Sequence, residues 1–481
     1  MNNRQQAAGH QRGLTRRNMI EAGSMAALNL SLPGLLRADD AQRRSLRSTT
    51  ASAAARIPAA AKSCILFFME GGPSHIDLWD MKPDAPDQIR GIYSPIDTSL
   101  PGLRICDQLP QLATRMHHFA TVRSVSHRIV DHNASTYYML TGQTPFRDGQ
   151  LIRGPGRDNA PPFGSVLSKF RPTGQALPDY VHLPKRMFNC GHFIPGVLAG
   201  FLGDRYDPFI AGDASRADYE VPGLERRVPD GRLNRRRHLL HDVDRALGTL
   251  GADRALDRLD TFYDKAFSLI TSAEARRAFR IQDETESTRR RYGLPRKVEG
   301  VRGGGLPHLG QSMLLARRLV EAGVRLVSVW AGGQAFDGHR NHFNSLSRGL
   351  CPATDRALSA LIDDLDERGL LDSTLVIALA EFGRTPKLGQ ITSTAGATPD
   401  GRDHWPNAYT ILLAGAGVRA GMVHGATDRI GAYPTESPVS PEDVAATVYQ
   451  LLGIDPHTRI RDPLNRPHTL APGRPIAPIL T

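Results

Sequence analysis

The chain has 481 residues, of which 40% are hydrophobic and 23% are charged. This composition is typical of a globular protein with a large core, and it excludes a disordered, collagen-like or disulfide-stabilised chain. The net charge of +11 suggests a nucleic-acid partner, but the 60 basic residues are scattered among 49 acids and only 6% of residues are aromatic. Because no basic stripe interleaved with aromatic residues is present, we expect no nucleic-acid partner.

More than half of the excess positive charge lies in the first 60 residues, which carry nine arginines and three acids. Thr15-Arg16-Arg17-Asn18-Met19-Ile20 is similar to a twin-arginine export signal, and a weakly apolar stretch, 22–36, follows it. Residues 1–60 are therefore predicted to be a twin-arginine signal and linker, with a disordered basic arm as the alternative. This predicts the twin-arginine export machinery as a partner and a periplasmic or secreted mature protein. No other segment is apolar enough to span a bilayer, so we expect no transmembrane helix in the mature protein.

The remainder, 61–481, shows alternating helix and strand signals. Short apolar runs predict strands, and amphipathic segments that end at glycine predict helices. The predicted strands are 64–69, 119–125, 180–183, 324–330, 374–380 and 409–413, and the predicted helices are 311–322, 354–368 and 441–452. Repeated helix-then-strand units predict an α/β fold, a three-layer α/β/α sandwich around a mostly parallel sheet.

The stretch 221–300 differs from the rest because it is arginine-rich and has helical periodicity. A capping box at Thr271 to Glu274 indicates a helix start there. We predict that this stretch is a helical insertion into the α/β domain. Its arginines are expected to form a solvated helical face, with binding of an anionic polymer as the alternative.

Five loops next to predicted strands carry histidines and carboxylates. Open α/β sheets bind ligands beyond the carboxyl ends of their strands, so these loops are candidates for one shared site. Imidazole and carboxylate together are the ligands of divalent ions such as Zn, Mn, Mg or Ca. The candidate residues are His75 and Asp77 in the first loop, His127 and His132 in the second, Asp337, His339 and His342 in the third, Glu381 and Arg384 in the fourth, and Asp403 and His404 in the fifth.

Several motifs resemble those of the domain of unknown function 1501 family, a group of exported sulfatase-like proteins in the alkaline phosphatase superfamily. The most specific are Gly71-Gly72-Pro73-Ser74-His75-Ile76-Asp77, Glu381-Phe382-Gly383-Arg384-Thr385 and Gly401-Arg402-Asp403-His404-Trp405. The resemblance implies an alkaline phosphatase or sulfatase-like fold. It also implies metal ligands at Asp77 with His75 beside it, at Asp337 with His339 or His342, and at His404. Glu381 stands where the superfamily has Asp, and Phe382 stands where it has His.

The nucleophile is the main departure from the sulfatase pattern. Sulfatases carry Cys or Ser in Cys/Ser-x-Pro-x-Arg nine residues before a Thr-Gly. In this sequence the residue nine positions before Thr141 is His132. Ser135 and Thr136 are the remaining hydroxyls in this loop. Either of them attacks the ester beside a metal, or water with a metal-lowered pKa attacks while His132 or His127 acts as base or ligand. Arg384 is expected to clamp an anionic oxygen, with an ordinary ion pair as the alternative.

These expectations converge on an exported, metal-dependent hydrolase of sulfate or phosphate esters. The substrate would be a small-molecule or polysaccharide ester. The alternative is a catalytically inactive sulfatase-like protein that binds a carbohydrate, a metal or a partner at the cell surface. The missing nucleophile signature favours this alternative, and the surviving Asp, His and Glu residues favour the hydrolase.

Overall fold

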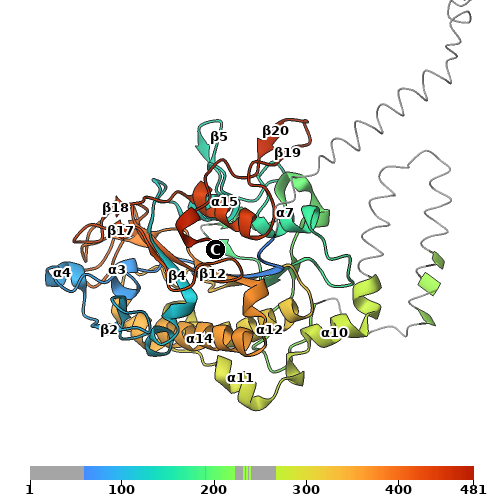
Figure 1. Cartoon of the computed structure of the whole chain (residues 1–481), viewed down its shortest axis with the longest axis horizontal. Coiled ribbons are helices and arrows are strands. Elements are labelled where there is room, and N and C mark those ends of the chain that lie inside the picture. Colours follow the sequence, from blue (N-terminus) through green and yellow to red (C-terminus); the bar gives the residue numbers. More distant parts are fainter. Residues whose placement is uncertain (1–58, 190, 223–230, 233–234, 237, 240–266) are drawn as a thin grey trace, which may run out of the picture. The chain divides into compact units, whose positions relative to one another are not determined.

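An eight-stranded sheet forms the centre of the computed structural model, which describes residues 59–189, 191–222, 231–232, 235–236, 238–239 and 267–481 (Figure 1). The strand order is β10-β7-β11-β1-β12-β15-β4-β16. The strands are β1 (Ser63–Phe68), β4 (Phe119–Val125), β7 (Tyr180–Leu183), β10 (Phe209–Ile210), β11 (Leu326–Trp330), β12 (Thr374–Leu379), β15 (Tyr409–Gly415) and β16 (Val423–His424). Neighbours pair in parallel except for β15, which runs antiparallel to β12 and β4.

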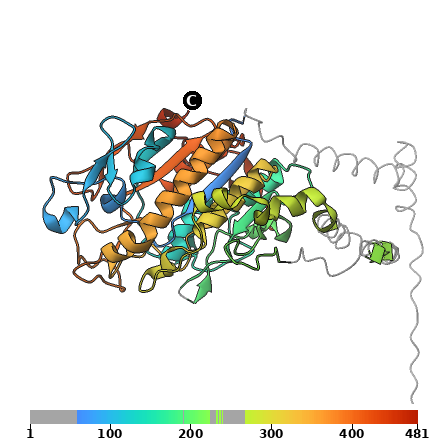
Figure 2. The same ribbon diagram turned by 90° about the horizontal axis from the view of Figure 1, so that it is seen from below.

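Helices cover both faces of this sheet, as predicted (Figures 1 and 2). On one face lie α5 (Pro110–Ala113), α10 (Ala273–Phe279), α11 (Glu286–Tyr292), α12 (Leu309–Glu321) and α14 (Cys351–Glu367), and on the other lie α6 (His132–Thr141), α7 (Phe163–Phe170) and α15 (Pro441–Leu451). Strand β1 shows why two layers are needed. Ile65 and Phe67 point into the core under α12 and α14, whereas Leu66 and Phe68 point into the core under α6, α7 and α15. Because both sets are buried, β1 is an unbroken apolar run rather than an alternating one.

Capping residues define the ends of the predicted helices. Ser440 and Asp443 form the predicted capping box at the start of α15, with Pro441 in the first turn. The predicted box at Thr271 is one residue out of place, because Ser272 is the N-cap of α10 and accepts a hydrogen bond from the Ala275 amide. The serine hydroxyl reaches the third helical amide from there, so the helix begins one residue later than the sequence indicated.

Short elements make up the loops between the sheet and its helices. They are α3 (His75–Leu78), α4 (Asp87–Arg90), β2 (Pro95–Asp97), β3 (Arg104–Cys106), η1 (Met116–His118), β5 (Phe146–Arg147), β6 (Gln150–Leu151), β8 (Phe188–Asn189), β9 (His192–Phe193), η2 (Gly200–Leu202), η3 (Asp204–Tyr206), η4 (Ile281–Asp283), η5 (Arg302–Gly305), α13 (His342–Ser345), η6 (Leu346–Leu350), η7 (Leu371–Ser373), β13 (Gly383–Arg384), β14 (His404–Trp405), β17 (Ala426–Thr427), β18 (Pro434–Glu436), β19 (Arg459–Arg461), β20 (Pro467–Thr469) and η8 (Ala477–Ile479). None of the helices in the described ranges has the length and apolar character needed to cross a bilayer.

The predicted leader and part of the predicted insertion lie outside the described residues. Within 267–300 the chain forms α10, η4 and α11. Arg317 of α12, which is 1% exposed, forms ion pairs with Glu284 of this segment and with Asp364 of α14. These buried ion pairs attach the segment to the α/β layer. The insertion itself and the boundary at residue 60 stay predictions.

Candidate metal centre

The five predicted loops meet at one edge of the sheet because of the direction in which each strand runs. Strands β1, β4, β11 and β12 are mutually parallel, so the loops that follow them leave the same edge. The fifth loop precedes its strand, and it reaches this edge because β15 is antiparallel. An antiparallel strand therefore brings residues 401–406 to the same place as the others.

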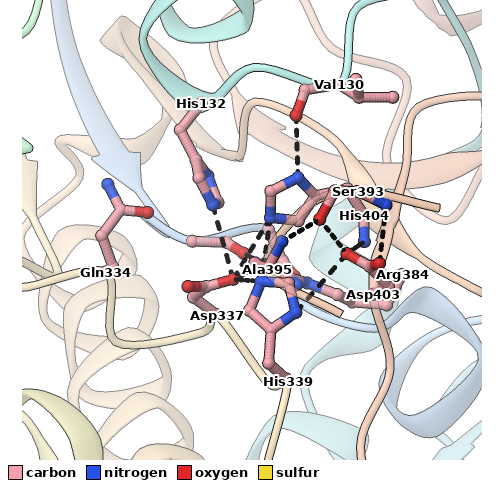
Figure 3. A network of polar contacts seen from close by, with 12 residues as sticks. Val130, His132, Gln334, Asp337, His339, Arg384, Ser393, Ala395, Asp403 and His404 are labelled. Carbon is pink, nitrogen blue, oxygen red and sulfur yellow. Dashed lines mark hydrogen bonds and ion pairs between the residues drawn. The ribbon is translucent and has the colours of Figure 1, made fainter. Parts of the chain in front are cut away.

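Four side chains form a compact cluster at this edge, which we call the His/Asp cluster: His132, Asp337, His339 and His404 (Figure 3). One potential ligand atom from each lies within 4.8 Å of the other three. Asp337 Oδ1 is 2.8 Å from Nε2 of His339, 3.4 Å from Nε2 of His132 and 3.5 Å from Nε2 of His404. Three imidazoles from three different loops thus converge on a single carboxylate oxygen.

The surroundings of the cluster shift the pKa values of its side chains in different directions. Burial raises the pKa of Asp337, but the neighbouring Arg384 and the three imidazoles outweigh it and hold the pKa well below the usual range. Burial lowers the pKa of His404 to about 4, so this imidazole is neutral at pH 7. Burial also lowers the pKa of His132, but hydrogen bonds to Asp337 and Glu381 raise it to about 9. A neutral imidazole and an ionised carboxylate are the forms that bind a metal ion.

Two arginines neutralise Asp337. Arg384 is fully buried and lies 2.6 Å from Asp337 Oδ1, and its other donors reach the carbonyls of Gly71, Gly72 and Arg402. The guanidinium therefore forms the ion pair that was the alternative to the anion clamp, and no face of it is open to a substrate. Arg302, whose side chain is 38% exposed, lies 2.5 Å from Asp337 Oδ2.

Two glutamates, Glu70 and Glu381, adjoin the His/Asp cluster and form what we call the acidic patch, with the amide of Gln334 beside them. Glu381 Oε1 accepts hydrogen bonds from the Gly71 amide at 2.8 Å and from His132 Nδ1 at 2.7 Å. Glu70 Oε1 accepts one from Gln334 Nε2 at 2.8 Å. Burial and the nearby charge of Glu381 raise the pKa of Glu70 to about 8.

Sequence reasoning missed Glu70 and Gln334. Glu70 is the first polar residue after the apolar run of β1, and that position was the available signal. Gln334 gives no signal in the sequence, since its φ of +52° and its burial emerge only in the fold. A non-glycine residue in the left-handed region is uncommon and often marks a functional site.

The unsatisfied polar atoms of this region fit a metal ion. Glu70 Oε2, Glu381 Oε2 and Gln334 Oε1 are buried and have no hydrogen-bond partner. Nε2 of His339 and Nε2 of His404 lie 3.0 Å apart, and only one of them can supply the proton between them. Buried polar groups are normally paired, and a cation would satisfy these lone pairs together.

Five predicted ligands lie outside the His/Asp cluster: Glu381 and Asp403 lie beside it, and Asp77, His342 and His75 are bound to other groups. Asp77 is bound by Arg402, with Nε to Oδ2 at 2.6 Å and Nη2 to Oδ1 at 2.9 Å, and His342 Nε2 lies 2.8 Å from its Oδ2. His75 Nε2 donates to the Gly431 carbonyl at 2.7 Å. The helical turn after β1 carries Asp77 into this buried ion pair, so Glu70, not Asp77, is the acid of the first loop that lies beside the cluster.

The predicted catalytic residues of the second loop also have other contacts. The Ser135 hydroxyl donates to the Ile129 carbonyl at 2.9 Å, and both Ser135 and Thr136 are buried in α6 outside the His/Asp cluster. His127 Nε2 donates to the Glu381 carbonyl at 2.7 Å, and its Nδ1 accepts from the Ile129 amide at 3.1 Å. His127 therefore supports the backbone of Glu381, and His132 is the member of this loop that faces the cluster.

Asp403 holds the fifth loop in shape beside the cluster. Its Oδ2 accepts from the amides of Thr392 and Ser393 at 2.7 and 2.8 Å, and its Oδ1 accepts from the Ser393 hydroxyl and the His404 amide at 2.6 and 2.7 Å. Asp403 Oδ1 also lies 3.4 Å from His339 Nδ1. The carboxylate thus orients two imidazoles of the cluster and is not itself among the four convergent groups.

Residues 61–480 match the model of a family described as a protein of unknown function (DUF1501). A comparison with curated protein sequences found no match. Solved structures with a similar fold include a sulfatase from Pseudoalteromonas sp. (12% identity over 86% of this chain and 71% of that chain, TM-score 0.35) and a phosphonate monoester hydrolase from Silicibacter pomeroyi (14%, 87% and 76%, TM-score 0.33). Another is an alkaline phosphatase from the Antarctic bacterium TAB5 (8%, 82% and 99%, TM-score 0.37). At sequence identities this low, the similarity is informative about the fold and not about activity or substrate.

Proposed function

The chain belongs to the DUF1501 family, and from this premise we propose that it is a metal-dependent hydrolase of sulfate or phosphate esters. The observation that carries the proposal is the convergence of three imidazole nitrogens on Asp337 Oδ1 at the sheet edge where α/β proteins bind ligands. Each imidazole has its own Nδ1 partner, which is Glu381 for His132 and a backbone carbonyl for His339 and for His404, and all three Nε2 atoms then face one carboxylate oxygen.

The donor set favours a borderline metal ion such as Zn²⁺ over the harder Mn²⁺, Ca²⁺ or Mg²⁺. Imidazole nitrogen outnumbers carboxylate oxygen among the four groups, whereas Ca²⁺ and Mg²⁺ prefer oxygen ligands. Asp337, His339 and His404 would hold the ion, and Glu70 and Glu381 are available to a second one. Such an ion supplies a Lewis acid that polarises the ester oxygen.

The other residues would position the substrate and move protons. His132 is fixed by the Nδ1 contact with Glu381, so its Nε2 is the atom that would exchange a proton with the attacking or leaving oxygen. Arg302 is half-buried at the edge of the cluster, so it takes the role that the sequence assigned to Arg384, namely contact with an anionic ester oxygen.

A binding protein without catalytic activity is the second candidate. The observation that favours it is the Ser135 hydroxyl, which is bound to the Ile129 carbonyl rather than directed at the cluster. In this alternative the His/Asp cluster would hold a metal for structural reasons. Turnover of any ester by the purified protein separates the two candidates.

We also propose that the mature protein is periplasmic or secreted. The support is the twin-arginine-like Arg16-Arg17 pair in the sequence. Replacing both arginines by lysine should leave the protein in the cytoplasmic fraction of its native cell. A native protein found in the cytoplasmic fraction would refute this location.

The central experiment joins metal analysis to an ester panel. Purified protein is expected to contain a stoichiometric divalent ion and to hydrolyse a sulfate ester, a phosphate monoester or a phosphate diester. Asp337→Ala and His404→Ala should lose both the ion and the turnover, while His457→Ala, which changes an exposed histidine, should keep both. Full turnover in the Asp337→Ala protein would refute the assignment.

A further inference from the structure

A small pocket beside α11 and α14 is lined by arginines and not by acids. Arg296 follows α11, Arg348 lies in η6 and Arg356 lies in α14, and all three line the pocket. Among the described residues that line it, none is Asp or Glu. We call it the arginine pocket. A lining of one sign attracts a ligand of the opposite sign, so its occupant should be an anion.

The arginine pocket stands out because neighbouring arginines are paired with acids. In α11, Arg290 lies 2.5 Å from Glu286, and Arg291 lies 2.6 Å from Glu367 of α14. The three pocket arginines, by contrast, form no hydrogen bond or ion pair with any residue in the described ranges. Guanidinium groups keep their charge at physiological pH, so they repel one another. An anion shared by the three arginines would offset this repulsion.

Backbone segments pack closely at the wall of this pocket. A Cβ on Gly349 would lie 2.8 Å from the Cα of Gly305, so these two backbones are in contact. A Cβ on Gly293 would lie 3.3 Å from Cδ of Arg356, so the Arg356 side chain packs against the backbone that leaves α11. The wall is therefore formed before a ligand binds, which lowers the entropy cost of binding. All three arginines are nevertheless exposed, so an anion reaches them from solvent.

The volume of the arginine pocket, about 140 Å³, restricts the size of its occupant. Drug-sized ligands occupy sites of about 300–1,000 Å³, so a chain of several rings does not fit inside it. A single sulfate or phosphate group is small enough, and its oxygens accept the paired N–H bonds of guanidinium groups. A carboxylate has only two oxygens for three arginines, whereas sulfate and phosphate groups have at least three.

We propose that the arginine pocket binds one sulfate or phosphate group, either as the free ion or as an ester group of a larger molecule. The pocket is separate from the His/Asp cluster, since none of the four cluster residues, all of which the structure describes, lines it. Binding in the pocket requires neither a metal ion nor hydrolysis. This inference and the proposed function can therefore fail separately.

The test is calorimetric titration of the purified full-length protein with inorganic sulfate, inorganic phosphate and a monosulfated disaccharide. The wild type should bind at least one of these probes, and the double variant Arg348→Gln/Arg356→Gln should bind it about tenfold more weakly, because charge-assisted hydrogen bonds are lost. The control variant Arg90→Gln/Arg290→Gln removes the same charge from two exposed arginines outside the pocket and should bind like the wild type. Thermal unfolding of each variant checks that the fold is intact.

The three probes also distinguish the two sources of the anion. Arginine-dependent binding that is tighter for the inorganic ions supports a site for the free ion, and tighter binding of the disaccharide supports a site for an ester group. Three results would overturn the inference: no binding of any probe, equal binding by the wild type and the pocket variant, and an equal loss of affinity in the control variant. Arginine-dependent binding in a protein that hydrolyses no ester would refute the proposed hydrolase and leave this inference standing.

Discussion

Replacing Asp77 by asparagine should destabilise the protein strongly although the residue lies outside the His/Asp cluster. Asp77 is 1% exposed and its partner Arg402 is fully buried, with Nε and Oδ2 2.6 Å apart. Removing one partner leaves an uncompensated buried charge, which costs about 3–5 kcal/mol. That is a large share of a typical free energy of unfolding, about 5–15 kcal/mol. Because His342 shares the same carboxylate, the change also loosens the loop that carries Asp337.

Denaturant unfolding at pH 7 measures this cost, with Asp87→Asn as the matched control. Asp87 forms the same kind of pair with Arg90 at 2.6 Å, but the two side chains are 89% and 48% exposed. Exposed pairs contribute about 0–1 kcal/mol, so the control should unfold almost like the wild type. Titration with Zn²⁺ should show weaker binding in Asp77→Asn only. Equal unfolding midpoints for the two variants would refute the reasoning from burial.

Three further predictions concern pH, the acidic patch and a glycine. Burial lowers the pKa of His182 to about 4. The unfolded chain therefore takes up a proton that the native state refuses, and the free energy of unfolding should fall by up to about 3 kcal/mol as pH drops from about 6.5 to about 4. His182→Gln should flatten this part of the curve in denaturant titrations. Since the pKa of Glu70 is raised to about 8, metal-free protein should lose stability as pH rises from about 4.5 to about 8. Glu70→Gln should remove that loss and weaken the stabilisation by Zn²⁺. Both effects can be read from melting temperatures, and an unchanged pH profile would contradict this prediction. Gly71→Ala should abolish metal binding measured by calorimetry, because φ is +105° and a Cβ would lie 2.4 Å from the Asp337 amide nitrogen. Gly149→Ala, with φ of +77° and open space around it, controls for backbone strain alone.

Hydrophobic patterning was sufficient for the α/β/α architecture because buried strands and amphipathic helices differ in period. The predicted run 64–69 differs from β1 by one residue at each end. The helix predicted over 354–368 begins three residues after the start of α14 and ends one residue after its end. Hydrophobic patterning does not predict the direction in which a strand runs. The segment 409–413 shows the apolar run of a buried strand, and only pairing with β12 and β4 makes β15 antiparallel.

Residue types predicted the site better than their individual roles. Asp337, His339 and His404 were expected as ligands, and they lie together in the His/Asp cluster. Asp77 and Glu70 are both acids near the end of β1, and nothing in the chain itself says which one meets an arginine. Arg402, 325 residues away, decides this by pairing with Asp77. Long-range electrostatic pairing of this kind is a property of the fold and not of local spacing.

The ion pair between Arg384 and Asp337 has a consequence for the order of assembly. A fully buried guanidinium already supplies the positive charge that the carboxylate needs, so the polypeptide carries an internal substitute for a cation. Folding should therefore precede loading, and the chain should refold in the presence of a chelator and accept Zn²⁺ afterwards. Zinc-finger domains follow the opposite order, since they stay unfolded until the metal arrives.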